Sequence, residues 1–137
     1  MVDRDVVARR ILALNEAIGN LRASNAGDES RLRSQALLRA AAERWMQVAI
    51  ESCIDLAFHV LADRGLPAPP SGRAAFQTLA MEGVLEAALA ERLGNAVSMR
   101  NVLVHDYVAV DLSILARAVR EDLSDLESFA SAIGRLL

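Results

Sequence analysis

One long stretch with helical apolar spacing, from about residue 29 to residue 64, most constrains what this chain can fold into. Its apolar residues fall on two lines along a predicted helix. The first line is Leu38, Ala42, Trp45, Ala49, Leu56 and Val60, and the second is Met46, Ile50, Ile54, Ala57 and Leu61. A helix with so wide an apolar surface is covered on more than one side. The stretch therefore predicts a helix that runs through the middle of a bundle or also serves a subunit interface.

The rest of the chain carries further helical patterns, separated by turn signals. An apolar stripe predicts a first helix over about 3–24, and residues 25–27 end it. Gly65 ends the long helix, and the proline-rich residues 66–70 form the clearest loop. Shorter helices are predicted over about 73–81 and 84–92, with Gly83 and Gly94 bracketing the second, and another begins near Asn95. Asp111 is placed to cap the last helix, whose stripe is Leu112, Leu115, Val119, Leu123, Leu126, Phe129 and Ile133.

Composition favours the same fold class. Hydrophobic residues make up 53% of the chain and aromatic residues only 4%, so Ala, Leu, Val and Ile build the core. Ala and Leu are strong helix formers, and only 7 Gly and 3 Pro interrupt them. We expect an all-α, up-and-down helical bundle of about five helices, which forms a single domain over residues 1–137.

The charge pattern and the single cysteine restrict location and partners. No apolar run looks long enough to span a bilayer, the charged N-terminus lacks a signal-peptide core, and the lone Cys53 fits a reducing compartment. We therefore expect a cytoplasmic protein with no membrane contact. The net charge of −3 argues against general nucleic-acid binding. Residues 1–44 hold 8 Arg against 6 acids, so we expect any local RNA contact there, although two differently charged solvated faces explain the asymmetry equally well.

The chemistry-bearing residues gather in one short segment, residues 100–107, with the sequence RNVLVHDY. Arg100 can bind phosphate through a planar fork of donors, and His105 can carry protons near neutral pH. In one ideal helix these two positions lie about 140° apart around the axis, so they do not face one ligand. Either the helix ends before His105, or two subunits share the site. A dimer offers two His and two Arg around one phosphate, which supplies both a base and an acid without a metal.

The spacing of Arg100, His105 and Tyr107, with Asn101 after the Arg, resembles the RxxxxHxY signature of HepT toxins in the HEPN superfamily. The resemblance extends along essentially the whole chain, through the residues Ala49–Ile50–Glu51, Ile54–Asp55, Leu66–Pro67, Phe76–Gln77, Leu79 and Gly83–Val84. It implies a homodimeric, metal-independent endoribonuclease that needs no cofactor and acts as the toxin of a type VII-like toxin–antitoxin pair.

The same resemblance implies roles for single residues. Arg100 and His105 would carry catalysis on an RNA substrate, and Asn101 would support the geometry of the site. The partner would be an MntA-like nucleotidyltransferase antitoxin that silences the toxin by transferring AMP to Tyr107. Glu51 and Asp55, four residues apart, read as a polar patch facing the motif or solvent, and Glu51 is a possible orienting residue for Arg100.

Other interpretations stay open at this point. The chain could be a non-catalytic helical partner that binds and regulates a nucleotidyltransferase, with Trp45–Met46 as part of an association surface. A purely structural helical module would leave Arg100 and His105 freely replaceable. His59 reads as a packing or surface residue, and no further ligands join it and Cys53 in a zinc pattern. No glycine-rich phosphate loop is present.

Overall fold

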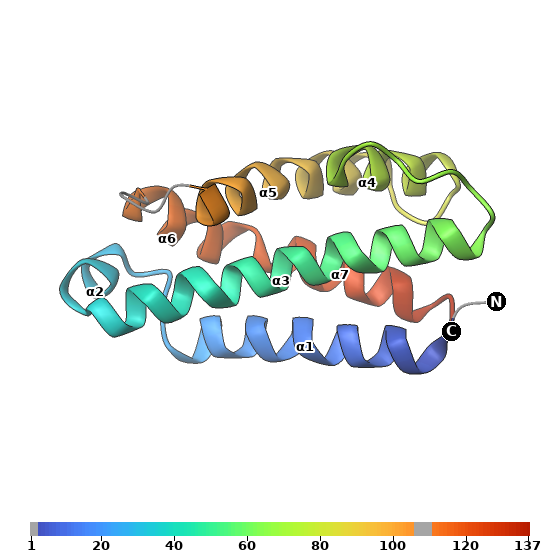
Figure 1. The fold of residues 1–137 in the computed structure, drawn as a ribbon. Helices are drawn as coiled ribbons and strands as arrows, with labels where there is room; N and C mark the ends of the chain where they lie inside the picture. The colour runs from blue at the N-terminus through green and yellow to red at the C-terminus, as the bar shows by residue number, and fades with distance from the viewer. Residues whose placement is uncertain (1–2, 106–110) are drawn as a thin grey trace.

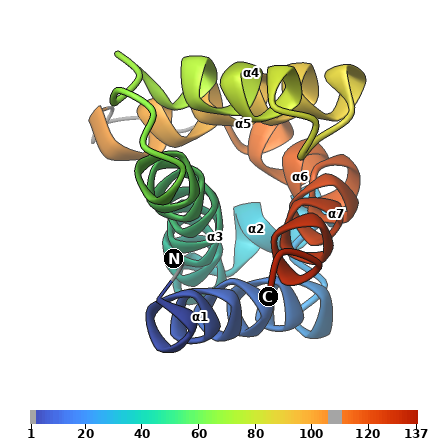
Figure 2. The same cartoon turned by 90° about the vertical axis from the view of Figure 1, so that its right-hand side faces the viewer.

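The structure is a computed structural model that describes residues 3–105 and 111–137, and of residues 104 and 105 only the backbone. Over these ranges it contains seven helices and no strand. Four long helical segments run side by side. They are α1 (Arg4–Ala23), α3 (Ala36–Asp63), α5 (Ala87–His105), and the consecutive helices α6 (Leu112–Glu121) and α7 (Leu123–Gly134), which together form the fourth. Successive segments run in opposite directions and surround the core on four sides (Figures 1 and 2). The predicted all-α, up-and-down bundle is confirmed, with more helices than the five expected.

Helix α3 is the central element, as its two apolar lines predict. Both lines are largely buried, and α3 packs against α1, α4 (Gly72–Met81), α5 and α7. Met46 is fully buried, so Trp45–Met46 does not form an exposed pair for association. By length and composition α3 is apolar enough to cross a membrane, contrary to the expectation that no run is long enough. More than half of that apolar window is buried inside the bundle, which is typical of a core helix.

Local signals in the sequence set several helix ends. Asp3, Ser71 and Asp111 accept hydrogen bonds from the first amides of α1, α4 and α6 through their side chains. Asn25 adopts φ +57° after α1, and Gly65 adopts φ +73° after α3. These left-handed residues let the following amides bond back to carbonyls of the last helical turn. The predicted bounds of α1 and α4 are therefore accurate to within about one residue.

The predicted helix over 29–64 is wrong in one respect, because it breaks at Gln35. There the backbone is extended, and it separates the short α2 (Glu29–Ser34) from α3. The break lets α2 turn back against α6 and bury Leu32 completely. Arginine side chains bond carbonyls at both ends of α2: Arg39 to Leu32 O in its last turn at 3.3 Å, and Arg120 to Gly27 O in the turn before it at 2.6 Å. No Gly or Pro marks the break, so tertiary packing decides it.

The predicted segments over 84–92 and from Asn95 are in fact one helix, α5, with Gly94 in its middle. Gly94 does not end a helix; it lets α4 approach. A Cβ at position 94 would lie 2.9 Å from Nη1 and 3.0 Å from Cγ of Arg73. The guanidinium of Arg73 passes over this glycine and donates to Asn95 Oδ1 and Ser98 Oγ.

The last predicted helix, over 112–133, is also two helices, with the junction at Asp122. Helix α6 packs against α2, whereas α7 packs against α1 and α3, so the two segments need different directions. The predicted apolar stripe is correct from Leu115 to Ile133 and lies in the core. At its centre Phe129 meets Phe76 edge to face, with ring centroids 5.5 Å apart.

The excess arginine charge of the N-terminal part is largely committed to the fold. Six of its eight arginines bond a carbonyl or carboxylate of the described chain: Arg4, Arg10, Arg22, Arg31, Arg33 and Arg39. Most of these arginines therefore have a structural partner, while side chains such as Arg10 and Arg33 stay about half or more exposed.

Candidate functional site on helix α5

Arg100 lies on the side of α5 that faces α3. Together with Glu51, Ile54 and Asp55 it lines a hollow of about 290 Å³. The side chain is half-buried, and its Nε is shielded from solvent without a hydrogen-bond partner in the described part of the chain. A guanidinium that has an N–H donor without an acceptor in that part of the chain, and that lies beside an open hollow, is suited to bind an oxyanion.

The two carboxylates of this hollow differ in their partners. Asp55 is already engaged by Arg10 of α1, whose Nη1 lies 2.9 Å from Asp55 Oδ2. Glu51 has no hydrogen bond or ion pair with any residue of the described ranges. The fold thus brings Glu51 and Arg100 to one hollow and leaves Glu51 as its unpaired carboxylate.

The other predicted site residues lie at or beyond the C-terminal end of α5. Asn101 is exposed on α5, and His105 is the last residue of that helix. The side chain of His105 and the whole of Asp106 and Tyr107 lie outside what the structure describes. The predicted roles of His105 and Tyr107 therefore stay predictions.

Because α5 continues through residue 105, the helix does not end before His105. Five residues at 100° each place positions 100 and 105 about 140° apart around the helix axis. Position 100 faces α3, so position 105 belongs to another side of the helix. The backbone of α5 therefore does not match the alternative in which the helix stops before residue 105, and a site shared by two subunits stays a prediction.

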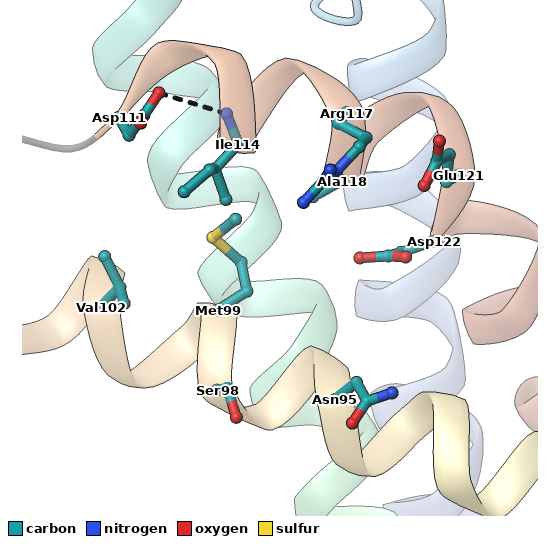
Figure 3. A pocket seen from close by; sticks show the side chains of 10 residues that line it. All are labelled: Asn95, Ser98, Met99, Val102, Asp111, Ile114, Arg117, Ala118, Glu121 and Asp122. Atoms are coloured by element: carbon teal, nitrogen blue, oxygen red, sulfur yellow. Dashed lines mark hydrogen bonds between the residues drawn. The ribbon is translucent and has the colours of Figure 1, made fainter.

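A second hollow lies on the opposite side of α5, in the groove between α5 and α6 (Figure 3). Its volume is about 440 Å³. Met99 and Ile114 face each other across one end, and Val102 and Ile114 stay 43% and 44% exposed. Asn95, Arg117 and Asp122 surround the other end.

Asp122 is the most perturbed carboxylate that the structure describes along this groove. Burial raises the pKa of Asp122 to about 6, and the neighbouring carboxylates of Asp125 and Glu121 act in the same direction. Its side chain makes no capping hydrogen bond to α7. Sequence reasoning missed this groove, since its residues come from two helices and only the α5 line 95, 98, 102 has a recognisable spacing.

Two residues set aside in the sequence stay outside both hollows. Cys53 is fully buried, and this burial raises the pKa of its thiol well above the usual range. His59 is half-buried on α3, with a shielded Nε2 that has no partner in the described ranges. Among residues 3–105 and 111–137, no group of three or more His, Cys, Asp or Glu is placed to hold a metal ion.

Comparison with known proteins gives a consistent result. Residues 3–133 match the family described as Ribonuclease HepT-like. The chain is 30% identical over 129 residues to the mRNA nuclease HepT of Shewanella oneidensis. This alignment covers 94% of this chain and 96% of that protein.

Solved structures show the same fold. A tri-AMPylated HEPN toxin of Shewanella oneidensis in complex with an MNT antitoxin matches with a TM-score of 0.87 and 29% identity, over 96% of this chain and 98% of that one. YutE of Bacillus subtilis, a cytosolic protein of unknown function, matches with a TM-score of 0.86 and 19% identity, over 99% of this chain and 91% of that one. The family match spans nearly the whole chain, and the protein belongs to the Ribonuclease HepT-like family of HEPN proteins.

Proposed function

We propose that this protein is a cytoplasmic, metal-independent endoribonuclease that acts as the toxin of a type VII-like HepT/MntA toxin–antitoxin pair. The observation that carries this proposal is the RxxxxHxY spacing of residues 100–107, in a chain that matches the HepT-like family over residues 3–133. The mRNA nuclease activity named for the Shewanella relative supports RNA as the substrate. The antitoxin complex of the related toxin supports a nucleotidyltransferase partner.

The proposed site is formed by two subunits. The register of α5 supports this arrangement, because positions 100 and 105 of one chain lie on different sides of the helix. In the dimer one His105 removes the proton of the RNA 2′-hydroxyl, and that oxygen attacks the adjacent phosphorus. The bond to the 5′ oxygen breaks, and the partner subunit's His105 protonates the leaving oxygen. The products are a 2′,3′-cyclic phosphate and a 5′-hydroxyl.

Arg100 would stabilise the negative charge that builds on the phosphorus oxygens. Glu51 is the positioning residue in this scheme, since it lines the Arg100 hollow and has no partner among the described residues. Asn101, exposed beside Arg100, would hold the RNA or the second subunit. No metal or other cofactor takes part in the proposed steps.

Silencing would occur at Tyr107. The MntA-like antitoxin would join the Tyr107 oxygen to the α-phosphorus of ATP, with pyrophosphate as the leaving group. The added AMP brings negative charge and bulk two residues from His105, which opposes binding of a phosphodiester.

The first experiment is cleavage of total RNA and purified tRNA in EDTA. We expect the wild type to cleave, and His105→Ala and Arg100→Ala to lose the activity by at least about a hundredfold. Arg64→Ala, at the far end of α3, is the matched arginine control and should cleave normally. A wild type free of AMP that does not cleave RNA would favour the alternative, a non-catalytic partner that regulates the nucleotidyltransferase.

A second experiment tests the shared site. Heterodimers of one wild-type subunit and one His105→Ala subunit can be isolated with two affinity tags. A single site that uses both histidines leaves such heterodimers nearly inactive. Independent sites in each subunit would instead leave about half of the wild-type activity, which would contradict the shared site while keeping the ribonuclease.

A further inference from the structure

The groove between α5 and α6 has the chemistry of a nucleobase site. One end is apolar, where Met99, Val102 and Ile114 offer a surface for an aromatic ring. The other end holds the polar groups of Asn95, Arg117 and Asp122. A volume of about 440 Å³ lies within the usual range for small-molecule pockets.

The charge of the groove favours an uncharged base over a phosphate. Three carboxylates line it, those of Asp111, Glu121 and Asp122, against one cation, Arg117. Asp111 caps α6, and its Oδ1 is already occupied: it accepts from the Ser113 amide at 2.9 Å and from the Ser113 hydroxyl at 2.6 Å. Glu121 and Asp122 remain at the polar end, and Asp122 is the less exposed of the two and an unpaired acceptor within the described ranges.

The donors of the polar end are oriented by the fold. Asn95 Oδ1 accepts two bonds from Arg73, both 3.3 Å long. This contact assigns the oxygen to the Arg73 side and leaves the Asn95 amide nitrogen as a donor for the groove. Arg117 is exposed on α6 and adds a guanidinium beside Asp122.

A carboxylate acceptor between two donors complements guanine among the four RNA bases. Guanine offers N1–H and N2–H as neighbouring donors, which a carboxylate accepts, and O6 and N7 as acceptors, which Arg or Asn donates to. Uracil and cytosine offer a smaller ring for the apolar end, and adenine presents an acceptor at N1 where Asp122 requires a donor.

The groove also leads toward the motif. Positions 95, 98 and 102 of α5 line it, and the next position at the same helical spacing is 105, three residues and about 4.5 Å along the axis beyond Val102. A base in the groove would therefore place its ribose and phosphate at the motif end of α5.

We propose that the α5–α6 groove binds a guanine next to the cleaved bond, through Asp122, Arg117 and Asn95. This proposal rests on the proposed ribonuclease function for its role in cleavage, whereas guanine binding itself is independent of it. Asp122 and Arg117 are specificity-determining residues in this scheme. The copy that supplies position 105 also reads the base.

The binding test uses 2′-O-methylated hexauridylate in which one nucleotide is guanosine, inosine, adenosine or cytidine, at pH 8. The methyl group blocks cleavage, so affinity is measured alone by fluorescence anisotropy. We expect guanosine to bind best and inosine, which lacks N2–H, to bind about tenfold more weakly. Asp122→Asn and Arg117→Ala should each lower guanosine affinity about tenfold to a hundredfold, and should change the affinity for the all-uridine 2′-O-methylated hexanucleotide much less. Arg64→Ala is the control.

The cleavage test uses a short RNA pool with randomised positions. We expect wild-type cuts beside guanine, and in Arg117→Ala a ratio of guanine to non-guanine cuts that falls about tenfold or more. Equal affinity for all four bases would overturn the guanine site, even if the RNA is cleaved. The guanine site would also be overturned if Asp122→Asn and Arg117→Ala leave base affinity unchanged and instead weaken dimerisation or binding of the nucleotidyltransferase. That result would assign the groove to a protein partner. If no RNA is cleaved, the proposed function fails, and the anisotropy measurement still decides whether guanine binds.

Discussion

Replacing Gly94 by Ala is expected to destabilise the protein, whereas Gly19→Ala is expected to stabilise it. Both glycines lie inside helices, where Ala is favoured over Gly by about 1 kcal/mol. An added Cβ at Gly19 meets nothing within 4 Å. At Gly94 it lies 2.9 Å from Arg73 Nη1 and 3.0 Å from Arg73 Cγ, so Arg73 must move.

The magnitude follows from what Arg73 loses when it moves. Its two bonds to Asn95 are 3.3 Å long and exposed, so each contributes about 0.5 kcal/mol. Crowding against Cγ costs at least about 1 kcal/mol more. The sum of about 2 kcal/mol exceeds the helix gain of about 1 kcal/mol, and leaves Gly94→Ala less stable by about 1 kcal/mol.

A double-mutant cycle isolates this contact. In an Arg73→Ala background the obstacle is gone, and Gly94→Ala should stabilise by about 1 kcal/mol, as Gly19→Ala does. The assay is urea unfolding followed by circular dichroism at one fixed protein concentration. A Gly94→Ala variant that is equally stabilised in both backgrounds would refute the reasoning that Arg73 requires a glycine at this position.

Three further changes test the core, the turn before α2 and the α5–α6 groove. Phe129→Ala should lower the free energy of unfolding by about 3–5 kcal/mol, because it removes the ring that meets Phe76, and a loss below about 1 kcal/mol in urea unfolding would mean that the site collapses around the change. Arg120→Met should cost about 1 kcal/mol through the lost bond to Gly27 O, seen as a lower thermal midpoint, with Arg64→Met as an unaffected control. The folded pKa of Asp122 is raised to about 6, so the folded state binds a proton between about pH 4 and 6 that the unfolded state does not. The free energy of unfolding should therefore fall by about 1 kcal/mol, after solvent screening, as pH rises from about 4 through 6. Asp122→Asn should remove most of this decline. A smaller part should remain from Glu43, because burial also raises the pKa of that carboxyl. An unchanged pH profile would show that Asp122 is solvated.

The fold was predictable where a local signal and the apolar pattern agree. Asp3, Ser71 and Asp111 begin helices, and Asn25 and Gly65 end them, because each acts on backbone groups within a few residues. The two lines on α3 and the stripe to Ile133 predict burial correctly for the same reason.

The wrong boundaries arise from contacts between distant segments. Gln35 breaks a helix so that α2 can cover α6, and Asp122 breaks another where the packing partners change. Gly94 was read as a boundary, but the reason for its lack of a side chain is Arg73, 21 positions earlier in the chain. No single-sequence pattern carries this information.

The site was predictable only as far as one helix carries it. The motif spacing predicts Arg100 and His105 as catalytic residues, which stays a prediction. Glu51, expected near Arg100, does line the same hollow. The separation of positions 100 and 105 also follows from sequence, once α5 is known to reach residue 105. The groove could not be found in this way, because Arg117 and Asp122 come from α6 and its junction with α7.

Because α5 carries one hollow on each side, changes on the two sides should act independently. Glu51→Gln alters the α3 side, where it leaves the Arg100 hollow without its unpaired carboxylate. Arg117→Ala alters the α6 side, where it removes a donor of the groove. Effects at sites that share no partner usually add as free energies, so the fold losses in kcat/KM should multiply in the double variant. Glu51→Gln should slow guanine-containing and guanine-free RNA alike, while Arg117→Ala slows only the former. A double variant no slower than the worse single variant would show that both residues act on one shared step, and would contradict the division of α5 into an Arg100 side and a base-reading side.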